Sequence, residues 1–277
     1  MRIHRYFVAL LGVAALAACG DKAERFIDAP VPTNSAIRFY NFGVNAPGVQ
    51  FYADNDKVVA ANSNTCYLAA NPPKTATDTL CLTIGSQATA GVTYGQLGAG
   101  ALYTSMTPAQ YTFSARQVTA TSGTSTTIAS VPLAMAGGKY YSYYLSGIYN
   151  STTKTSDAFV VEDPLPTTID WTKVQVRFVN AISNSQPMTL YAISTDATPT
   201  TTALGSAAAY KTASAFTALT PGVYNLEART ATGTVAISRL NVNFLAGHVY
   251  TISARGDMTV TSTTATNRPF LDNSANQ

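Results

Sequence analysis

Cys66 and Cys81 are the two side chains whose chemistry is easiest to state. In an exported protein they would form a disulfide, which closes a 15-residue loop and contributes about 3 kcal/mol in the entropic account. A metal or redox pair is the alternative. It is disfavoured because the cysteines are not spaced as Cys-x-x-Cys and no histidine lies near them in the sequence.

A second group of residues has the oxygen atoms that calcium prefers, namely Asp54, Asn55 and Asp56. The same stretch is typical of a hairpin turn, because Asn and Asp tolerate left-handed backbone. We favour the turn over a metal site and expect no metal and no other cofactor.

His248 is the one histidine that could serve catalysis, since His4 lies in a targeting segment. A Ser-His-Asp site needs a nucleophile beside the imidazole. His248 instead starts an expected strand on the same face as Tyr250, and Gly138 takes its place in an earlier copy of the motif. We expect a half-buried histidine at a rim, and we assign no catalytic residue.

Tyrosines crowd the stretch "KYYSYYLSGIY" at 139–149. Alternate residues of a strand face opposite sides, so Tyr140 and Tyr144 share one face and Tyr141 and Tyr143 share the other. One pair can fill the core, and the other would face outward and offer broad amphipathic contact to a sugar or a protein. Tyr141 and Tyr143 are the candidate ligand contacts. Edge and core packing is the alternative.

The elements that position these residues follow a targeting segment. Arg2 and Arg5 precede the apolar run "YFVALLGVAALAA", which is too short to span a bilayer and is typical of a signal peptide over 1–18. Its end, Leu-Ala-Ala-Cys19, resembles the lipobox of bacterial lipoproteins. The resemblance implies cleavage before Cys19 and acylation of its thiol; the alternative is an ordinary signal peptide with an accidental cysteine. Gly20, where inner-membrane lipoproteins carry Asp, favours the outer membrane.

The composition excludes one class of partner. Charged residues are 11% of the chain, against about a quarter in ordinary domains, so Thr, Ser, Asn, Gln and Tyr must form much of the surface. The net charge of +3 falls to +1 once Arg2 and Arg5 are removed. That is too little to bind a phosphate backbone, and we expect no nucleic-acid partner.

Motifs that occur twice predict the architecture. In the expected first strand of each copy, Phe39 or Phe178 faces inward and Arg38 or Arg177 faces outward, which is the period of a half-buried strand. With turn residues between short strands and no amphipathic helix, the pattern predicts an all-β chain of two tandem Ig-like antiparallel β-sandwiches. The paired motifs are "RFYNF" at 38–42 with "RFVNA" at 177–181, "TPAQYTFSAR" at 107–116 with "TPGVYNLEAR" at 220–229, and "AGGKYY" at 136–141 with "AGHVYT" at 246–251.

The same series resembles a bacterial family known as domain of unknown function 4397, whose members often carry the domain in tandem behind a lipoprotein signal. The matching residues are 174–181, 220–224 and 246–250, with weaker echoes in the first copy. The resemblance implies an Ig-like sandwich and an envelope location, and it supplies no catalytic residue.

We therefore expect a non-enzymatic, lipid-anchored envelope protein, a binding or adhesion-type module whose partner is a glycan or an envelope protein. A purely structural component is the alternative, and an envelope hydrolase is less favoured. The expected boundaries are a tether at 19–35, a first repeat at 36–165 with the cysteines in an insertion, a linker at 166–172, a second repeat at 173–272 and a frayed tail at 273–277.

Overall fold

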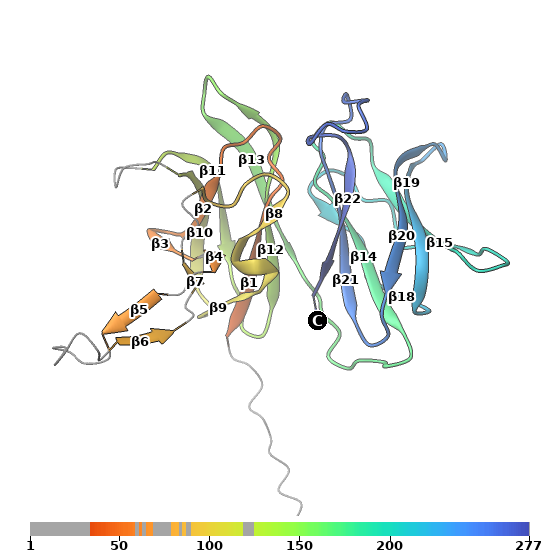
Figure 1. Cartoon of the computed structure of the whole chain (residues 1–277), viewed down its shortest axis with the longest axis horizontal. Helices are drawn as coiled ribbons and strands as arrows, with labels where there is room; N and C mark the ends of the chain where they lie inside the picture. The colour runs from red at the N-terminus through yellow and green to blue at the C-terminus, as the bar shows by residue number, and fades with distance from the viewer. Residues whose placement is uncertain are drawn as a thin grey trace, which may run out of the picture. The chain divides into compact units, whose positions relative to one another are not determined.

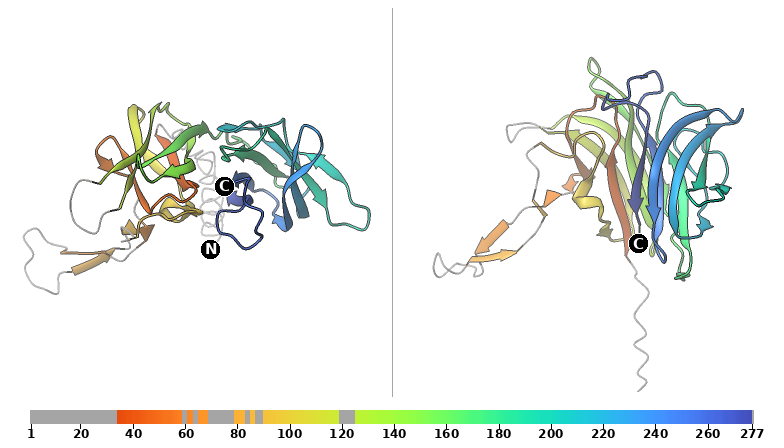
Figure 2. Two further views of the ribbon diagram at one scale, coloured as in Figure 1. Left: turned by 90° about the horizontal axis from the view of Figure 1, so that it is seen from above. Right: turned by 45° about the vertical axis from the view of Figure 1, so that its right-hand side comes forward.

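The chain folds into two β-sandwiches in tandem, as the sequence predicts (Figure 1). The structure is a computed structural model that describes residues 34–58, 61–62, 65–68, 79–82, 85–86, 90–118 and 125–276. Within these residues the regular structure is β, apart from the 3-10 turn η2 (Gly98–Ala101). Each sandwich consists of two facing sheets, which Figure 2 shows from two further sides.

In the first sandwich, one sheet contains β1 (Ser35–Asn41), β8 (Gln96–Leu97), β9 (Thr104–Met106), β12 (Tyr140–Asn150) and β13 (Thr155–Glu162). The facing sheet contains β2 (Val49–Ala53), β3 (Asp56–Lys57), β10 (Gln110–Gln117) and β11 (Thr127–Ala134). Short strands from the expected insertion pair among themselves, β4 (Ala61–Asn62) with β7 (Gly85–Ser86) and β5 (Thr65–Leu68) with β6 (Thr79–Leu82).

The second sandwich repeats this plan. One sheet contains β14 (Val174–Asn180), β17 (Thr212–Ala213), β18 (Thr217–Leu219), β21 (Val249–Arg255) and β22 (Phe270–Ala275). The other contains β15 (Met188–Ser194), β16 (Thr201–Ala203), β19 (Gly222–Thr230) and β20 (Val235–Phe244).

One pairing in each sandwich is parallel: β1 with β12, and β14 with β21. Arg38 lies opposite Ser142 in the first and Arg177 opposite Thr251 in the second. This shared register makes Gly138 equivalent to Gly247, not to His248 as the ungapped motif comparison suggests. The physical reason is the backbone, because φ is +72° at Gly138 and +73° at Gly247, a region that favours glycine.

The repeated Thr-Pro-x-x-Tyr motif has a local cause. The Tyr111 hydroxyl donates to the Thr107 carbonyl at 3.0 Å, and the Tyr224 hydroxyl donates to the Thr220 carbonyl at 2.7 Å. A tyrosine that bonds back to the backbone a few residues upstream is a feature of Ig-like sandwiches, where it fixes the turn between two strands.

Each sandwich has a hydrophobic core of its own. Phe39, Phe51 and Phe113 pack at the centre of the first core. The second core is drawn from residues between Val174 and Leu271. Burying these side chains is the main favourable contribution to folding.

A third cluster lies between the two repeats and covers the outer faces of β1, β12 and β14. Its fully buried members are Tyr40, Phe42, Tyr144, Phe159, Val179 and Ala181. Arg38 and Arg177 point away from the core of their own sandwich, as predicted, but they are buried and not exposed to solvent as a half-buried strand implies. Alternation shows which residues share a face of a strand, but not that a second domain covers the polar face.

The C-terminal residues are also more ordered than predicted. Residues 273–277 were expected to fray, but β22 continues to Ala275 and Ser274 is buried. The strand pairs with β21 through its backbone, Ser253 opposite Asp272 and Thr251 opposite Ser274. Backbone pairing at a sheet edge needs no apolar periodicity, so residue patterns do not predict it.

Candidate functional site

Tyr141 and Tyr143 do not form an exposed ligand-binding pair. Tyr143 is 0% exposed and Tyr141 6% exposed, and both belong to the first core. Tyr144, on the opposite face, is stacked between Tyr40 and Phe159 in the cluster between the repeats. The prediction that Tyr141 and Tyr143 face outward is thus wrong, because both faces of this part of β12 are covered. In the second repeat the residue equivalent to Tyr141 is Tyr250, which is likewise buried.

Of the three cysteines, the structure describes the backbone of Cys66 and Cys81. Cys19 and its acylation lie outside the described residues. Cys66 lies opposite Cys81 in the antiparallel pair of β5 and β6.

The expected hairpin at Asp54 and Asn55 is confirmed. Ala53 pairs with Asp56 across this two-residue turn, and Asp54 adopts φ of +52°. Among the residues that the structure describes, no three His, Cys, Asp or Glu side chains gather as a metal site would require. Within the same residues, no helix is long and apolar enough to cross a membrane.

His248 is half-buried at the start of β21, with its ring 5.9 Å from that of Tyr250. Its carbonyl accepts a hydrogen bond from the Gln175 amide at 3.0 Å, which joins the turn before β21 to the start of β14. This position at a rim agrees with the sequence-based expectation.

A buried polar network that the sequence analysis missed surrounds the carboxylate of Asp163. Asp163 follows β13 directly, is buried, and forms an ion pair with Arg177. It also accepts hydrogen bonds from the Ser142 hydroxyl at 2.7 Å and the Tyr103 hydroxyl at 2.6 Å. Burial beside this carboxylate raises the pKa of Tyr103, so its hydroxyl keeps the proton it donates.

The two arginines of the repeated motif act reciprocally across the repeats. Arg177 Nη1 donates to the carbonyl of Glu162, the last residue of β13, at 2.9 Å. Arg38 Nη1 donates to the carbonyl of Ala275, the last residue of β22, at 3.0 Å. Each copy's arginine therefore caps the final strand of the other copy, which explains why Arg recurs in the motif.

The arrangement departs from symmetry at one position. Asp163 and Asn276 follow the equivalent strands. Asp163 accepts a hydrogen bond from the Ser142 hydroxyl, and Asn276 accepts one from the Thr251 hydroxyl. Only the first of these residues is charged. Among the residues that the structure describes, Asp163 is thus the one buried carboxylate at an interface that contains two buried arginines. Arg38 is linked to it through Ser142, to which Arg38 Nε donates at 3.2 Å. These contacts join the two repeats.

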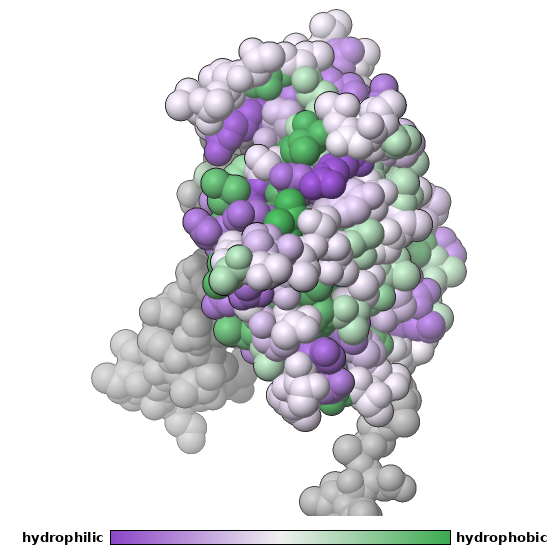
Figure 3. Space-filling view, turned by 90° about the vertical axis from the view of Figure 1, so that its right-hand side faces the viewer, coloured by the Kyte–Doolittle hydropathy of each residue, from purple (hydrophilic) through white to green (hydrophobic). Residues whose placement is uncertain are grey.

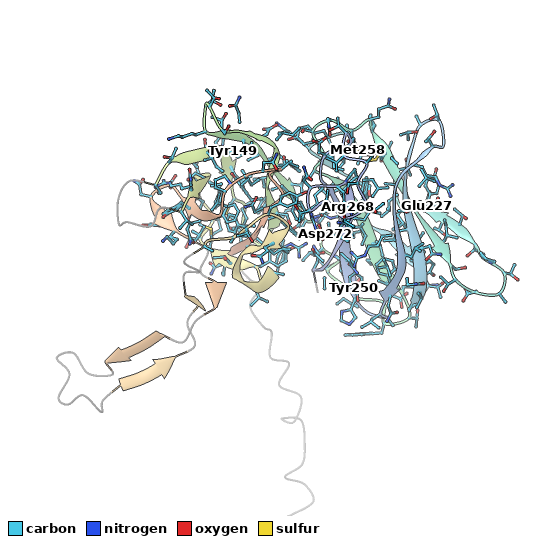
Figure 4. The ribbon with its side chains drawn as sticks, turned by 45° about the horizontal axis from the view of Figure 1, so that its top comes forward. Tyr149, Glu227, Tyr250, Met258, Arg268 and Asp272 are labelled. Carbon is cyan, nitrogen blue, oxygen red and sulfur yellow. The ribbon has the colours of Figure 1, made fainter. Side chains whose placement is uncertain are left out.

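A pocket of about 360 Å³ lies at one end of the second sandwich, at the lower end of the range for small-molecule sites. Met258, which lines it, is at the upper edge of that sandwich, while Tyr250 is near the lower end (Figure 4). Hydroxyl and amide groups form the walls, and methionine and alanine side chains provide the apolar surface. The lining residues are Asn184, Ser185, Gln186, Met188, Thr230, Thr232, Thr234, Ala236 and Met258.

The pocket lining contains no charged side chain, so it suits an uncharged ligand with several hydrogen-bonding groups. The hydroxyls of Thr230 and Thr232 lie 2.9 Å apart, and those of Thr232 and Thr234 lie 3.2 Å apart, which forms a row of groups that can donate or accept. The side of the second sandwich seen in Figure 3 has mostly pale, intermediate hydropathy with scattered apolar and polar residues.

Comparison with known proteins identifies the class of protein that this fold represents. The chain belongs to the family described as Domain of unknown function (DUF4397), which matches residues 35–191 and again residues 174–277. The two matches correspond to tandem copies of one domain, as the repeated motifs indicate. A comparison with curated proteins finds no match.

Proposed function

We propose that this chain is a lipid-anchored, non-enzymatic protein of the bacterial outer membrane, a binding module whose ligand site is the pocket beside Met258. The observation that carries the proposal is Leu-Ala-Ala-Cys19 behind a short apolar run. Acyl chains on Cys19 would hold the protein at a membrane, since each buried CH₂ contributes about 0.8 kcal/mol. The tether to Ser35 is 16 residues, about 55 Å when fully extended.

A disulfide between Cys66 and Cys81 is part of the proposal, and the register of β5 and β6 supports it. Directly opposite residues of an antiparallel pair have Cα atoms about 4.5–5.5 Å apart, within the range that a disulfide spans. Export to an oxidising compartment, implied by the signal sequence, is the condition under which the bond would persist.

We expect Cys19→Ala to abolish incorporation of an alkyne-tagged fatty acid and to leave the precursor at full length, because the thiol is both the acylation site and the recognition point for cleavage. Gel fluorescence after tagging the cell lysate measures this. Cys81→Ala is the matched control, since it removes another cysteine and should retain labelling. Continued labelling of the Cys19→Ala protein would rule out the anchor.

We expect Thr232→Phe to fill the pocket and to weaken binding of any glycan that the wild-type protein retains on an envelope-glycan array by about tenfold or more, equal to about 1.4 kcal/mol. Ala231→Phe is the control, because its neighbour lines the pocket and Ala231 does not. Equal binding by both variants would place the ligand elsewhere. Absence of binding by the wild-type protein would favour the second candidate, a purely structural component, which the buried ion pair of Asp163 with Arg177 between the repeats supports.

A further inference from the structure

Both the chain's entry into the fold and the link between the repeats lie at one end of the sandwiches. The amide of Ala36, at the start of β1, donates to the carbonyl of Lys139, which precedes β12. The amide of Asp163, just past β13, donates to the carbonyl of Tyr140. The start of β1 and the end of β13 are therefore neighbours, and Figure 1 shows β1 beginning at this lower end.

Two exposed apolar side chains of the second sandwich lie at this same end. Residues 163–173 lead from β13 into β14, whose start is joined to the turn before β21 by the Gly247 amide, which donates to the Lys173 carbonyl at 2.8 Å. Trp171 is 74% exposed and Leu245 is 50% exposed on these two segments. They are part of the end through which any N-terminal tether must enter.

Trp171 is held in this exposed position by its neighbours. Asp170 Oδ1 accepts hydrogen bonds from the Thr172 amide at 2.8 Å and from the Thr172 hydroxyl at 2.6 Å, which fixes the turn. One side of the indole ring lies against Gly247, where a Cβ atom would collide with it. The lack of a side chain at Gly247 thus makes room for the ring, and the rest of the ring faces outward. An indole ring held in water does not gain the free energy that burial of its apolar surface would supply.

We propose that this end of the second sandwich docks on the lipid surface to which Cys19 is anchored, with Trp171 and Leu245 in the headgroup region. The inference rests on the proposed anchor. Tryptophan, like tyrosine, is enriched at membrane interfaces, because its ring is apolar and its N–H remains hydrated. A tether of 16 residues has a relaxed span of about 22 Å, short enough to keep this end near the bilayer.

Charge does not drive the docking. The charged side chains at this end include Lys139, Glu162, Asp170, Lys173 and Asp196, which are of both signs, and Lys139 pairs with Glu162 at 2.7 Å. An electrostatic attachment would weaken with salt, whereas burial of Trp171 and Leu245 would not. The docking is therefore expected to be insensitive to salt and to the content of anionic lipid.

Trp171 reports on its own environment, because it is the one tryptophan of the chain. The lipidated mature protein is reconstituted in vesicles of phosphatidylethanolamine and phosphatidylglycerol. We expect its emission to move to shorter wavelength, to be quenched severalfold by lipid brominated near the headgroup, and to be protected from acrylamide. Leu245→Ser should reduce the quenching by brominated lipid. Leu240→Ser, which alters another exposed leucine in the middle of β20, should not.

Flotation of the vesicles separates the two proposals. Protein that fails to float has no anchor, and both proposals fall together. Protein that floats but has Trp171 open to acrylamide and unaffected by brominated lipid keeps the anchor and overturns the docking. Emission shielded from both quenchers would mean that protein covers Trp171, which also overturns the docking.

Discussion

Asp163→Asn lowers the free energy of unfolding by about 3–5 kcal/mol, because it leaves buried arginine charge without its counter-ion. The Asp163 side chain is 0% exposed and that of Arg177 is 1% exposed, so water cannot replace the lost interaction. Arg38 is affected as well, since Ser142 connects it to the same carboxylate. Urea denaturation followed by far-UV circular dichroism measures the change.

Glu162→Gln is the matched control for this experiment. Glu162 is the preceding residue and also forms an ion pair, with Lys139, but both side chains are about half exposed. Water screens such a pair, and the denaturation midpoint should stay within error of wild type. The double variant Asp163→Asn with Arg177→Met should recover part of the loss, because it also removes the stranded charge. Equal effects of the two single variants would contradict the assignment of Asp163 as the central group of the interface.

Tyr143→Ala lowers the free energy of unfolding by about 3–5 kcal/mol, the cost of removing a large aromatic ring from a packed core. The Tyr143 ring lies 5.8 Å from that of Phe39 and 5.5 Å from that of Phe51, so the substitution opens a cavity between the two sheets. Tyr143→Phe retains the ring and should cost less than about 1.5 kcal/mol. Thermal or urea unfolding provides both values.

This second experiment also decides how a loss of ligand binding would be interpreted. A tyrosine that contacts a ligand would leave stability unchanged when truncated, whereas Tyr143→Ala should lose structure first. Tyr149→Ala, in the same strand but only half-buried, is the control and should cost less. Wild-type stability of the Tyr143→Ala protein would show that the ring does not fill the core.

The sequence predicts the sandwiches well because local patterns determine a strand. Val174, Val176 and Phe178 alternate with polar residues, and all three are buried in the second core. The Thr-Pro-x-x-Tyr motif predicts a turn entering a strand, and the structure adds the hydroxyl bond of Tyr111 and Tyr224 as its reason.

The same patterns do not predict what covers a strand's second face. Arg38 and Arg177 have the sequence positions of exposed residues. Their burial depends on contacts with the other repeat, at Ala275 for Arg38 and at Glu162 for Arg177. Asp163 follows β13 beside a proline, where an acid ordinarily marks a solvated linker. Its partners Ser142, in β12, and Tyr103, just before β9, become neighbours only when β1 pairs with both strands.

The parallel pairing of β1 with β12 determines how the first sandwich bears mechanical load. A pull on the N-terminal chain acts along β1, and the register from Ala36 opposite Tyr140 to Asn41 opposite Leu145 lies along the direction of that pull. The hydrogen bonds between the strands are then stressed in shear, and all of them must fail together instead of opening one at a time. If the protein is anchored at its N-terminus and pulled at its opposite end, the pairing of β1 with β12 would therefore resist unfolding of the first sandwich.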